Sequence, residues 1–413
     1  MCLYCFGAQN RWSCVRNNNR NSWNFNNNGN FNNNNFNNGY RVSFVSELKA
    51  IRLVISSMVD FEKLYDSYLK ARKNKRRSRD SVEFEFNYES NLINLQKEIN
   101  DRTYTAKKGN YSFIVYSPKP REIFATKMNN RIVHHLLDTE LRPLYEKELS
   151  INSFNNRVGK GTHAAIKTFR EYIKEVSCNY TKDAYVYHLD IKGFFPNASV
   201  NVALKQQQQI IESYQGIYKE DLRFLMDKVL NADPARNCTR IIQESKWKVI
   251  PKEKSLFHKP VGTGAAIGFL CWQNAMGIYP NEITKYVESL GYHIVVFVDD
   301  IFVVDSDKSF LKVIPTIRKK LEELHITLNN KFYCQHYKKG ILMLGYFLKG
   351  SKIFINRKTV SNSIKKCKNN LQSANSYSGL YANTNSIIDF NQFSSHVCSK
   401  FGFEICSRTD CFC

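Results

Sequence analysis

The sequence predicts an α+β fold, and three patterns carry this prediction. Tyr185–Asp190 has the pattern of a short strand that ends in a carboxylate. The run Ile294–Val304 is apolar on both sides of Asp299 and Asp300, which is typical of a β-hairpin with an acidic turn. Helical periodicity covers residues 131–149, where apolar side chains share one face. No repeat of fixed period is visible.

The other elements follow from the same two periodicities. Before residue 180 we expect a helix that begins at Ser46 and continues through Phe61 to Lys73, a basic linker over 72–79, a helix over 90–100 and a strand over 111–116. Pro118 and Pro120 end that strand. After residue 190 we expect helices near 200–213, 218–231, 266–290 and 310–325, strand segments over 331–358, and a basic helix over 360–374.

The composition indicates a folded, strongly basic protein. The chain has 413 residues, 43% of them hydrophobic, which is enough for two or three domain-sized units. It carries 60 Lys and Arg residues against 37 Asp and Glu residues, a formal net charge of +23. Nucleic acid is the usual partner of such a chain, because each cation laid on a phosphate releases condensed counterions. A basic surface without a specific partner is the alternative.

The cysteines and the apolar runs bear on location. Residues 1–20 lack the continuous apolar region of a secretory signal, and no window of about 18 apolar residues predicts a membrane span. We therefore expect a cytoplasmic protein without a membrane, in which most of the 12 cysteines are buried thiols. Cys2, Cys5, Cys406, Cys411 and Cys413 suggest metal ligands, but no stretch contains a complete four-ligand zinc site.

The N-terminal segment is compositionally extreme. Asparagine fills 15 of the 22 positions of residues 17–38. Such a stretch cannot bury enough apolar surface to offset its ordering entropy, so we expect residues 1–45 to be a disordered extension. Self-association of the asparagine tract is the alternative interpretation.

Three aspartates are the candidate catalytic residues. Adjacent carboxylates such as Asp299 and Asp300 are costly beside apolar runs unless a cation neutralises them. Magnesium suits this role, because it binds a few carboxylates together with substrate phosphates. Two such ions, about 4 Å apart, activate an attacking 3′-hydroxyl and stabilise the leaving pyrophosphate. The strand end at Asp190 and the turn at Asp299 and Asp300 supply carboxylates from separate strands; an ordinary acidic turn is the alternative.

Over residues 105–350 the chain resembles the reverse transcriptases. Phe297-Val-Asp-Asp is similar to the Tyr-x-Asp-Asp box of that family, and Leu189-Asp-Ile-Lys-Gly-Phe-Phe-Pro-Asn is similar to its first carboxylate motif. Further motifs in the same order are Pro120–Ile123, Asn130–His135, Ser153–Ala165, Leu328–Lys331 and Leu344–Tyr346. Asn130 departs from the pattern, because bacterial members usually have Asp there.

The resemblance implies a right-hand polymerase that copies RNA into DNA. Its parts would be fingers with N-terminal helices over 46–180, a palm over 181–350 and a short thumb over 351–413. The implied partners are template RNA, primer, cDNA product, dNTP substrates and a small basic accessory protein, and the implied cofactor is a pair of Mg²⁺ ions. Lysines of the thumb helix would follow the nucleic-acid backbone: Lys358, Lys365, Lys366 and Lys368.

The resemblance also implies roles for residues around the metal ions. Asp190 and Asp299 would be direct metal ligands, and Asp300 would be a ligand or a neighbour. The backbone carbonyl of Ile191 would help to hold the ion on the nucleotide side. Lys331 would donate a proton to pyrophosphate; a surface lysine is an equal alternative.

Other residues would contact nucleotide or template. Arg121 would grip the triphosphate, because a guanidinium fork suits phosphate oxygens. Phe195 would lie under the sugar and exclude a 2′-hydroxyl, while Phe194 would pack in the core. A set in the loop after residue 153 would meet template or substrate phosphates: Asn156, Arg157 and Lys160.

The segment 266–273 indicates the subgroup. Its Ile267 and Gln273 match the pattern of reverse transcriptases from diversity-generating retroelements, whereas Trp272 departs from it. An aliphatic residue at Ile267 removes an amide near the nucleotide sugar and the fingers arginine. The resemblance therefore implies misincorporation at template adenines. A group II intron or retron-type enzyme, or a catalytically silent RNA-binding protein of the same fold, remains an alternative.

The asparagine tract fits this subgroup in a second way. Adenine-rich template repeats of the family, when translated, give Asn-rich runs with scattered Trp, Phe and Gly. We hypothesise that residues 10–44 are such a repeat read in frame. A disordered tail would look the same at the protein level.

Overall fold

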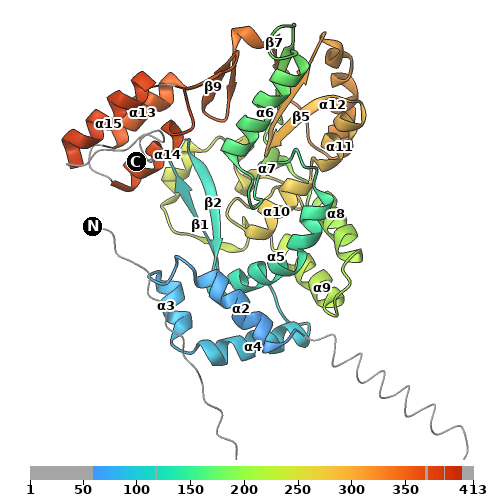
Figure 1. Cartoon of the computed structure of the whole chain (residues 1–413). Coiled ribbons are helices and arrows are strands. Elements are labelled where there is room, and N and C mark those ends of the chain that lie inside the picture. Colours follow the sequence, from blue (N-terminus) through green and yellow to red (C-terminus); the bar gives the residue numbers. More distant parts are fainter. Residues whose placement is uncertain (1–58, 117–118, 368–370, 386, 402–413) are drawn as a thin grey trace, which may run out of the picture. The chain divides into compact units, whose positions relative to one another are not determined.

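The structure is a computed structural model that describes residues 59–116, 119–367, 371–385 and 387–401. The expectations for the asparagine-rich extension, the translated repeat, the first part of the helix from Ser46, the five candidate zinc-ligand cysteines and Lys368 lie outside these residues. The predicted mixture of helices and strands is confirmed (Figure 1). None of the helices that the structure describes is long and apolar enough to cross a membrane.

Four helices precede and follow the first hairpin: α2 Phe61–Arg72, α3 Arg79–Glu85, α4 Tyr88–Asn100 and α5 Met128–Glu148. α2 begins where Asp60 accepts a hydrogen bond from the Lys63 N–H at 2.7 Å, an N-cap that satisfies a free helix donor. Its buried Leu64 and Tyr68 belong to the same apolar core as Ile132 of α5. The basic linker expected over 72–79 is a run of turns that ends at α3.

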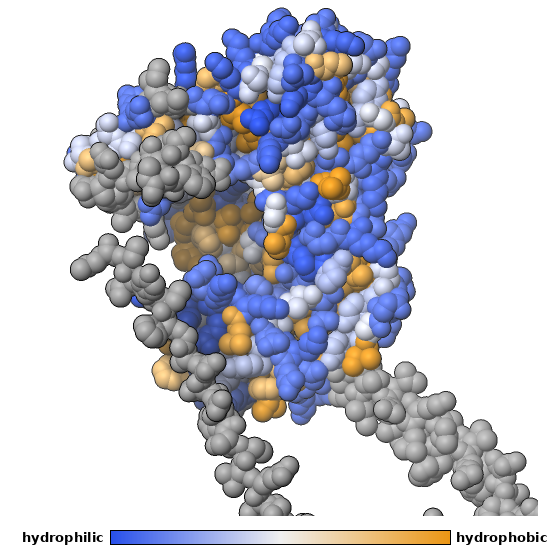
Figure 2. All heavy atoms as spheres, viewed as in Figure 1, coloured by the Kyte–Doolittle hydropathy of each residue, from blue (hydrophilic) through white to orange (hydrophobic). Residues whose placement is uncertain are grey.

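The first sheet has the strand order β2-β1-β4. β1 Asn110–Val115 and β2 Arg121–Thr126 form an antiparallel hairpin, and β4 Cys238–Arg240 pairs in parallel with β1. One sheet therefore contains strands from both the range predicted as fingers and the range predicted as palm. Most of the face in Figure 2 is hydrophilic, with apolar surface gathered in the recess where β1 and β2 lie.

The second sheet is antiparallel, with the strand order β5-β6-β3-β7. Its strands are β3 Tyr185–Asp190, β5 His293–Phe297, β6 Asp300–Asp305 and β7 Tyr333–His336. β3 and the β5–β6 hairpin lie where the sequence predicts them.

This sheet separates two apolar cores, because side chains alternate between its faces. One face, with Leu189 and Ile301, belongs to the larger core, which includes α5 and α10 Leu270–Ile278. The other face, with Val186 and Phe302, belongs to a second core beneath α6 Thr162–Val176. Asp190 and Asp300 extend the second face to the edge of the sheet.

Helices cover the larger core: α7 Phe194–Asn197, α8 Val200–Glu212, α9 Lys219–Leu230, α10 Leu270–Ile278, α11 Asn281–Ser289 and α12 Ile314–Glu323. The single helix expected over 266–290 was wrong, because the chain breaks between α10 and α11. Pro280 precedes α11 and lacks the N–H that a continuous helix needs.

The C-terminal part contains a small sheet of β8 Ile341–Met343, β9 Tyr346–Lys349 and β10 Lys352–Ile355. Three helices follow: α13 Arg357–Lys366, α14 Leu371–Tyr381 and α15 Ile387–Phe401. The expected basic helix over 360–374 corresponds to α13 and the start of α14, with residues 368–370 undescribed between them. Phe393 and Val397 of α15 pack into the second core.

Candidate active site

The pairing of β3 with β6 places two of the three candidate aspartates together. Asp190 and Asp300 are directly opposite each other in the antiparallel register. Beyond them, the Ile191 N–H donates to the carbonyl oxygen of Asp299 at 3.0 Å. All three aspartates therefore lie at one edge of the sheet, as the sequence predicts.

The turn between β5 and β6 holds Asp299 on a strained backbone. Val298 has φ +61°, a left-handed conformation that a β-branched residue rarely adopts. Such strain costs about 1–3 kcal/mol and persists only where the surroundings fix it. Here the Val298 N–H donates to Oδ1 of the buried Asn155 at 3.4 Å. The Phe154 N–H also donates to the carbonyl of Val296 at 3.0 Å, so the segment ahead of Asn156 braces the turn.

Burial, followed by neighbouring negative charge, raises the pKa of two aspartates. Burial raises the pKa of Asp299 to about 6; Asp300 adds to the rise, and the positive charge of Arg121 opposes it. Burial, followed by the charge of Asp300, also raises the pKa of Asp190, while Lys119 opposes that rise. The two cations that oppose these shifts come from the β1–β2 hairpin, which therefore faces the aspartates.

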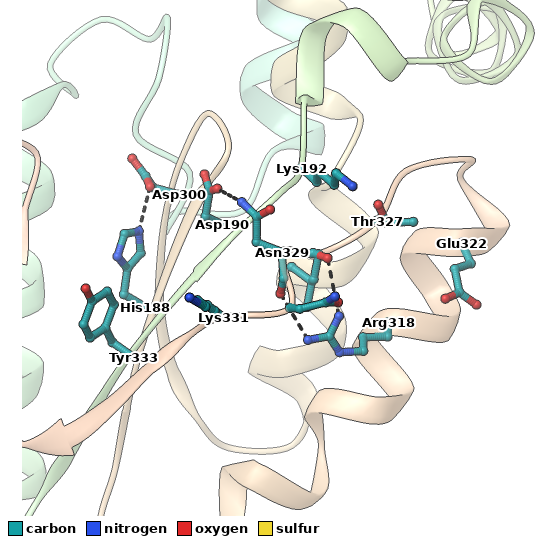
Figure 3. Close-up of a pocket in the computed structure, with 12 residues that line it drawn as sticks. His188, Asp190, Lys192, Asp300, Arg318, Glu322, Thr327, Asn329, Lys331 and Tyr333 are labelled. Carbon is teal, nitrogen blue, oxygen red and sulfur yellow. Dashed lines mark hydrogen bonds and ion pairs between the residues drawn. The ribbon is translucent and has the colours of Figure 1, made fainter. Parts of the chain in front are cut away.

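Asp190 and Asp300 each have a side-chain partner. Asp300 Oδ1 is 2.7 Å from His188 Nε2, and Asp190 Oδ2 accepts a hydrogen bond from Asn329 Nδ2 (Figure 3). In the described part of the chain, no group of three His, Cys, Asp or Glu side chains is arranged as a ready-made metal cluster. The two carboxylates turn toward different neighbours.

The donor set nevertheless fits magnesium. Carboxylate oxygens are its preferred protein ligands, and few are needed when substrate phosphates complete the shell. The raised pKa of Asp299 and of Asp190 means that charge neutralisation at this edge is favourable. The residues that would hold the ions are Asp190, Asp299 and Asp300, with the backbone carbonyl of Ile191.

A cavity of about 700 Å³ opens beside β3 (Figure 3). It is lined by the carboxylates of Asp190 and Asp300 and by three cationic side chains, Lys192, Arg318 and Lys331. Arg318 is held in place by bonds to the carbonyls of Leu328 and Asn329. Lys331 thus lies in the same cavity as two candidate metal ligands, whereas Asp299 does not line it.

The hairpin strand that begins at Arg121 contacts the segment predicted to determine the subgroup. The Phe124 N–H donates to the carbonyl of Ile267 at 2.8 Å. Gly268 follows with φ +113°, and a Cβ there would lie 2.2 Å from the Phe124 carbonyl oxygen. Ile267 is half-buried in a turn, and its partner Phe124 lies three positions after Arg121 on β2. The structure therefore brings Arg121 and Ile267 into one neighbourhood.

The other residues predicted around the nucleotide differ in how deeply they are buried. Phe194 is buried, as predicted, and Phe195 is half-buried beside it, with its carbonyl accepting the Ala265 N–H at 2.7 Å. Trp272, which departs from the resembled pattern, is fully buried in the larger core. Gln273 is half-buried on α10.

The loop before α6 contains the three predicted template contacts. Asn156 is exposed, and its Nδ2 donates to the Gln273 carbonyl at 3.1 Å. Arg157 has a side chain only 7% exposed; it pairs with Glu146 at 2.8 Å and donates to backbone carbonyls. Arg157 therefore holds the loop in shape. Lys160 donates to the Ile151 carbonyl at 2.7 Å, and burial followed by the charge of Arg157 lowers its pKa.

Asn130 has a structural reason to differ from aspartate. Its Nδ2 donates to the Lys108 carbonyl at 2.8 Å and to Thr126 Oγ1 at 2.9 Å, and its Oδ1 accepts from the Tyr104 hydroxyl at 2.9 Å. An ionised carboxylate cannot donate to a carbonyl. The amide therefore joins β1, β2 and α5 in a way that aspartate would not.

Four residues near the aspartates were missed in the sequence: Lys119, Asn155, His188 and Asn329. His188 was detectable, because it precedes Asp190 by two positions on a predicted strand and must share its face. Asn155 and Asn329 lie in motifs that resemble the family but carried no assigned role. Lys119 gave no signal, since its proximity to the aspartates depends on tertiary packing.

The six described cysteines are free thiols: Cys178, Cys238, Cys271, Cys334, Cys367 and Cys398. Two of them, Cys271 and Cys367, are buried, and Cys178 is exposed. The expectation of mostly buried thiols is therefore met only in part within the described residues.

No protein-family model and no curated protein matches the chain. Among solved structures, apo telomerase from Candida tropicalis gives a TM-score of 0.46 at 11% identity, over 72% of this chain and 59% of that chain. The same telomerase truncated from its C-terminal domain gives 0.45 at 11% identity, over 61% and 56%. Telomerase from Candida albicans, in complex with a TWJ fragment of telomeric RNA, gives 0.44 at 12% identity, over 78% and 60%. The chain thus spans 56% to 60% of the length of these chains.

Proposed function

We propose that the protein is an RNA-directed DNA polymerase with the architecture of a right hand. The observation that carries the proposal is the register of β3 and β6, which places Asp190 opposite Asp300 with Asp299 on a braced turn beside them. The motif order over residues 105–350 adds support.

The chain's residues would divide the chemistry between them. Two Mg²⁺ ions, when bound, supply activation of the primer 3′-hydroxyl and charge stabilisation of the leaving pyrophosphate. Asp190 would hold the ions from the end of β3, and Asp299 would hold them from the turn between β5 and β6. The braced turn would keep Asp299 aimed at the edge of the sheet, so that little reorganisation is needed when substrate binds.

Cations around this edge would bind the triphosphate. The positive charges of Arg121 and Lys119 act on Asp299 and Asp190, so the cations and the aspartates face one another. A nucleotide bound between the two groups would have cations at its phosphates on one side and the metal-binding carboxylates on the other. A guanidinium binds two phosphate oxygens at once, which orients the triphosphate for in-line attack. Lys331, in the cavity beside Asp190, would hold a proton for the departing pyrophosphate.

The decisive experiment is primer extension on an RNA template with Mg²⁺. Asp190→Asn and Asp299→Asn keep the side-chain shape but remove the charge that would hold the ions, so extension should fall to background. Asp183→Asn is the matched control: its carboxylate is 75% exposed and pairs with His336 at the other end of β3. Wild-type extension in either active-site variant would refute the mechanism. A wild type that binds RNA without extending a primer would instead indicate a silent RNA-binding protein.

We further propose that the enzyme belongs to the diversity-generating type and misincorporates at template adenines. Support comes from Ile267, which lies against the strand that carries Arg121 and offers no amide to the nucleotide. Ile267→Gln should lower the error rate at template adenines in a fidelity assay, whereas Ile267→Leu should not. An accurate wild type, or an error rate unchanged by glutamine, would remove the subgroup assignment.

Under this proposal residues 10–44 are a template repeat that carries information as nucleic acid. Deleting residues 1–45 should then leave primer extension on a supplied primer–template intact. A small basic accessory protein belongs to the same proposal, and pull-down with the enzyme is its direct test.

A further inference from the structure

His188 on β3 is fixed in position by the two neighbouring strands, β6 and β7. It lies directly opposite Phe302 of β6 and opposite Tyr333 of β7 in the two registers of β3. Its ring stacks on Phe302 at 4.4 Å between centroids and 11° between planes. The Tyr333 ring is parallel to it within 9°, at 6.4 Å. The imidazole therefore has little freedom to rotate.

The ring directs one nitrogen at Asp300. Nε2 of His188 lies 2.7 Å from Oδ1 of Asp300, and an ionised carboxylate can only accept, so Nε2 is the donor. Both side chains are partly exposed, at 23% and 29%. In Figure 3 this bond turns the Asp300 carboxylate toward His188 and away from the hydrogen bond between Asp190 and Asn329.

One oxygen of Asp300, Oδ1, is thus engaged with His188, and Oδ2 remains available to bind a cation. A free carboxylate on a strand end samples several rotamers, and each bond that fixes it lowers the ordering cost of binding a cation. Partners that orient ligand carboxylates commonly change metal affinity or activity by about 10–100-fold.

We infer that His188 is a positioning residue that acts through Asp300, fixing the carboxylate at the metal-binding edge of the sheet. The inference rests on the proposed function for its kinetic readout. The effect of His188 on the metal site passes through the hydrogen bond from Nε2 to Oδ1 of Asp300, and stacking on Phe302 holds the donor ring in place.

The test is a double-mutant cycle. His188→Phe keeps the stack and removes the donor, whereas His188→Gln supplies an amide donor. We expect His188→Phe to weaken Mn²⁺ binding, measured by electron paramagnetic resonance, by about tenfold and to lower kcat similarly with an unchanged nucleotide KM. His188→Gln should recover part of both losses. In an Asp300→Asn background, His188→Phe should have little further effect, because a residue that works only through Asp300 has nothing left to orient.

His336→Phe is the matched control. It removes another imidazole of the same sheet, also paired with an aspartate, Asp183 at 3.1 Å, and packed edge-on against Tyr185. It should leave Mn²⁺ affinity and kcat unchanged. Thermal unfolding of each variant identifies any loss of fold.

The outcomes separate this inference from the proposed function. If the wild type extends primers but His188→Phe leaves Mn²⁺ affinity and kcat at wild-type values, the inference alone is overturned. Additive losses in the cycle overturn it as well, because His188 would then act independently of Asp300. If the wild type extends no primer, yet the cycle on Mn²⁺ affinity is non-additive, the polymerase proposal fails and the His188–Asp300 coupling stands.

Discussion

At the scale of single residues, buried polar contacts explain why Asn130 stands where the resembled motif has aspartate. Asn130 is buried and joins strand and helix backbones through its amide. A carboxylate at this position could still accept from the Tyr104 hydroxyl, but it could not donate to the Lys108 carbonyl, and its charge would lie against that oxygen. Sequence alone showed the departure, but the reason for it lies in contacts with residues 20 or more positions away.

Asn130→Asp should lower the free energy of unfolding at pH 7 by about 2–4 kcal/mol. The introduced carboxyl would have a folded pKa above its unfolded value, so the deficit should vanish at pH below the unfolded pKa and appear as pH rises through the folded one. Asn129→Asp is the control, because Asn129 is exposed at the start of α5. Denaturant unfolding at several pH values measures both variants; equal stability of the two would contradict the contact assignment.

His134 gives a second residue-scale prediction. Burial, followed by the charges of His135 and Arg131, lowers the pKa of His134 to about 3, and its Nε2 is buried without a hydrogen-bond partner among the described residues. The neutral form is therefore favoured in the fold. Stability from this group is full above the unfolded pKa and falls, by up to about 1.4 kcal/mol per pH unit, as pH drops from about 6.5 toward the folded value.

His134→Leu should flatten the dependence of unfolding free energy on pH between about 6.5 and 4. His325→Asn is the control, because His325 is exposed and Asn tolerates its φ of +59°. Chemical denaturation across this range reports the slope. An identical slope in wild type and His134→Leu would exclude His134 as its source.

At the scale of elements, local patterns were predictable and long-range pairings were not. β3 and the β5–β6 hairpin are apolar runs bounded by acidic residues, and the sequence places them correctly. β2 was missed because it is a short strand that begins with two charged residues, Arg121 and Glu122. Pro118 and Pro120 precede it, and α5 begins two positions after it ends. β4 has three residues and exists by pairing with β1, more than a hundred positions earlier. The aspartates were predicted together with their strands, because they end or interrupt the apolar runs. The contact of Asn155 with Val298 depends on packing between elements and has no local pattern.

The junction between the first hairpin and α10 depends on Gly268. A Cβ there meets the Phe124 carbonyl oxygen at 2.2 Å, while Gly262, with a comparable positive φ of +78°, has nothing within 4 Å. Gly268→Ala and Gly262→Ala share the backbone strain of about 1–2 kcal/mol. Only Gly268→Ala should also push the Ile267 segment off β2, with a further loss of stability and a raised nucleotide KM. Equal effects on unfolding and on KM would show that the contact is unimportant.

At the scale of the whole molecule, the net charge of +23 has a measurable consequence. Lys358 and Lys365 lie seven positions apart on α13, both exposed and on one face of the helix. If this face follows a nucleic-acid backbone, each lysine releases condensed counterions on binding. The wild type should then lose about 10³-fold or more in affinity for a primer–template between 50 and 200 mM salt if it makes six or more phosphate contacts.

The double variant Lys358→Gln, Lys365→Gln should reduce the slope of log affinity against log salt concentration by about 1.4–1.8, because each phosphate contact contributes about 0.7–0.9. Lys219→Gln with Lys228→Gln removes the same charge from α9, where Lys219 donates to the Glu212 carbonyl, and serves as the control. Fluorescence anisotropy with a labelled primer–template gives both slopes. A charge acting only through the long-range field would lower affinity equally in the two double variants. A difference confined to the α13 variant would therefore locate the backbone contact on that helix, because counterion release requires each lysine to lie at a phosphate.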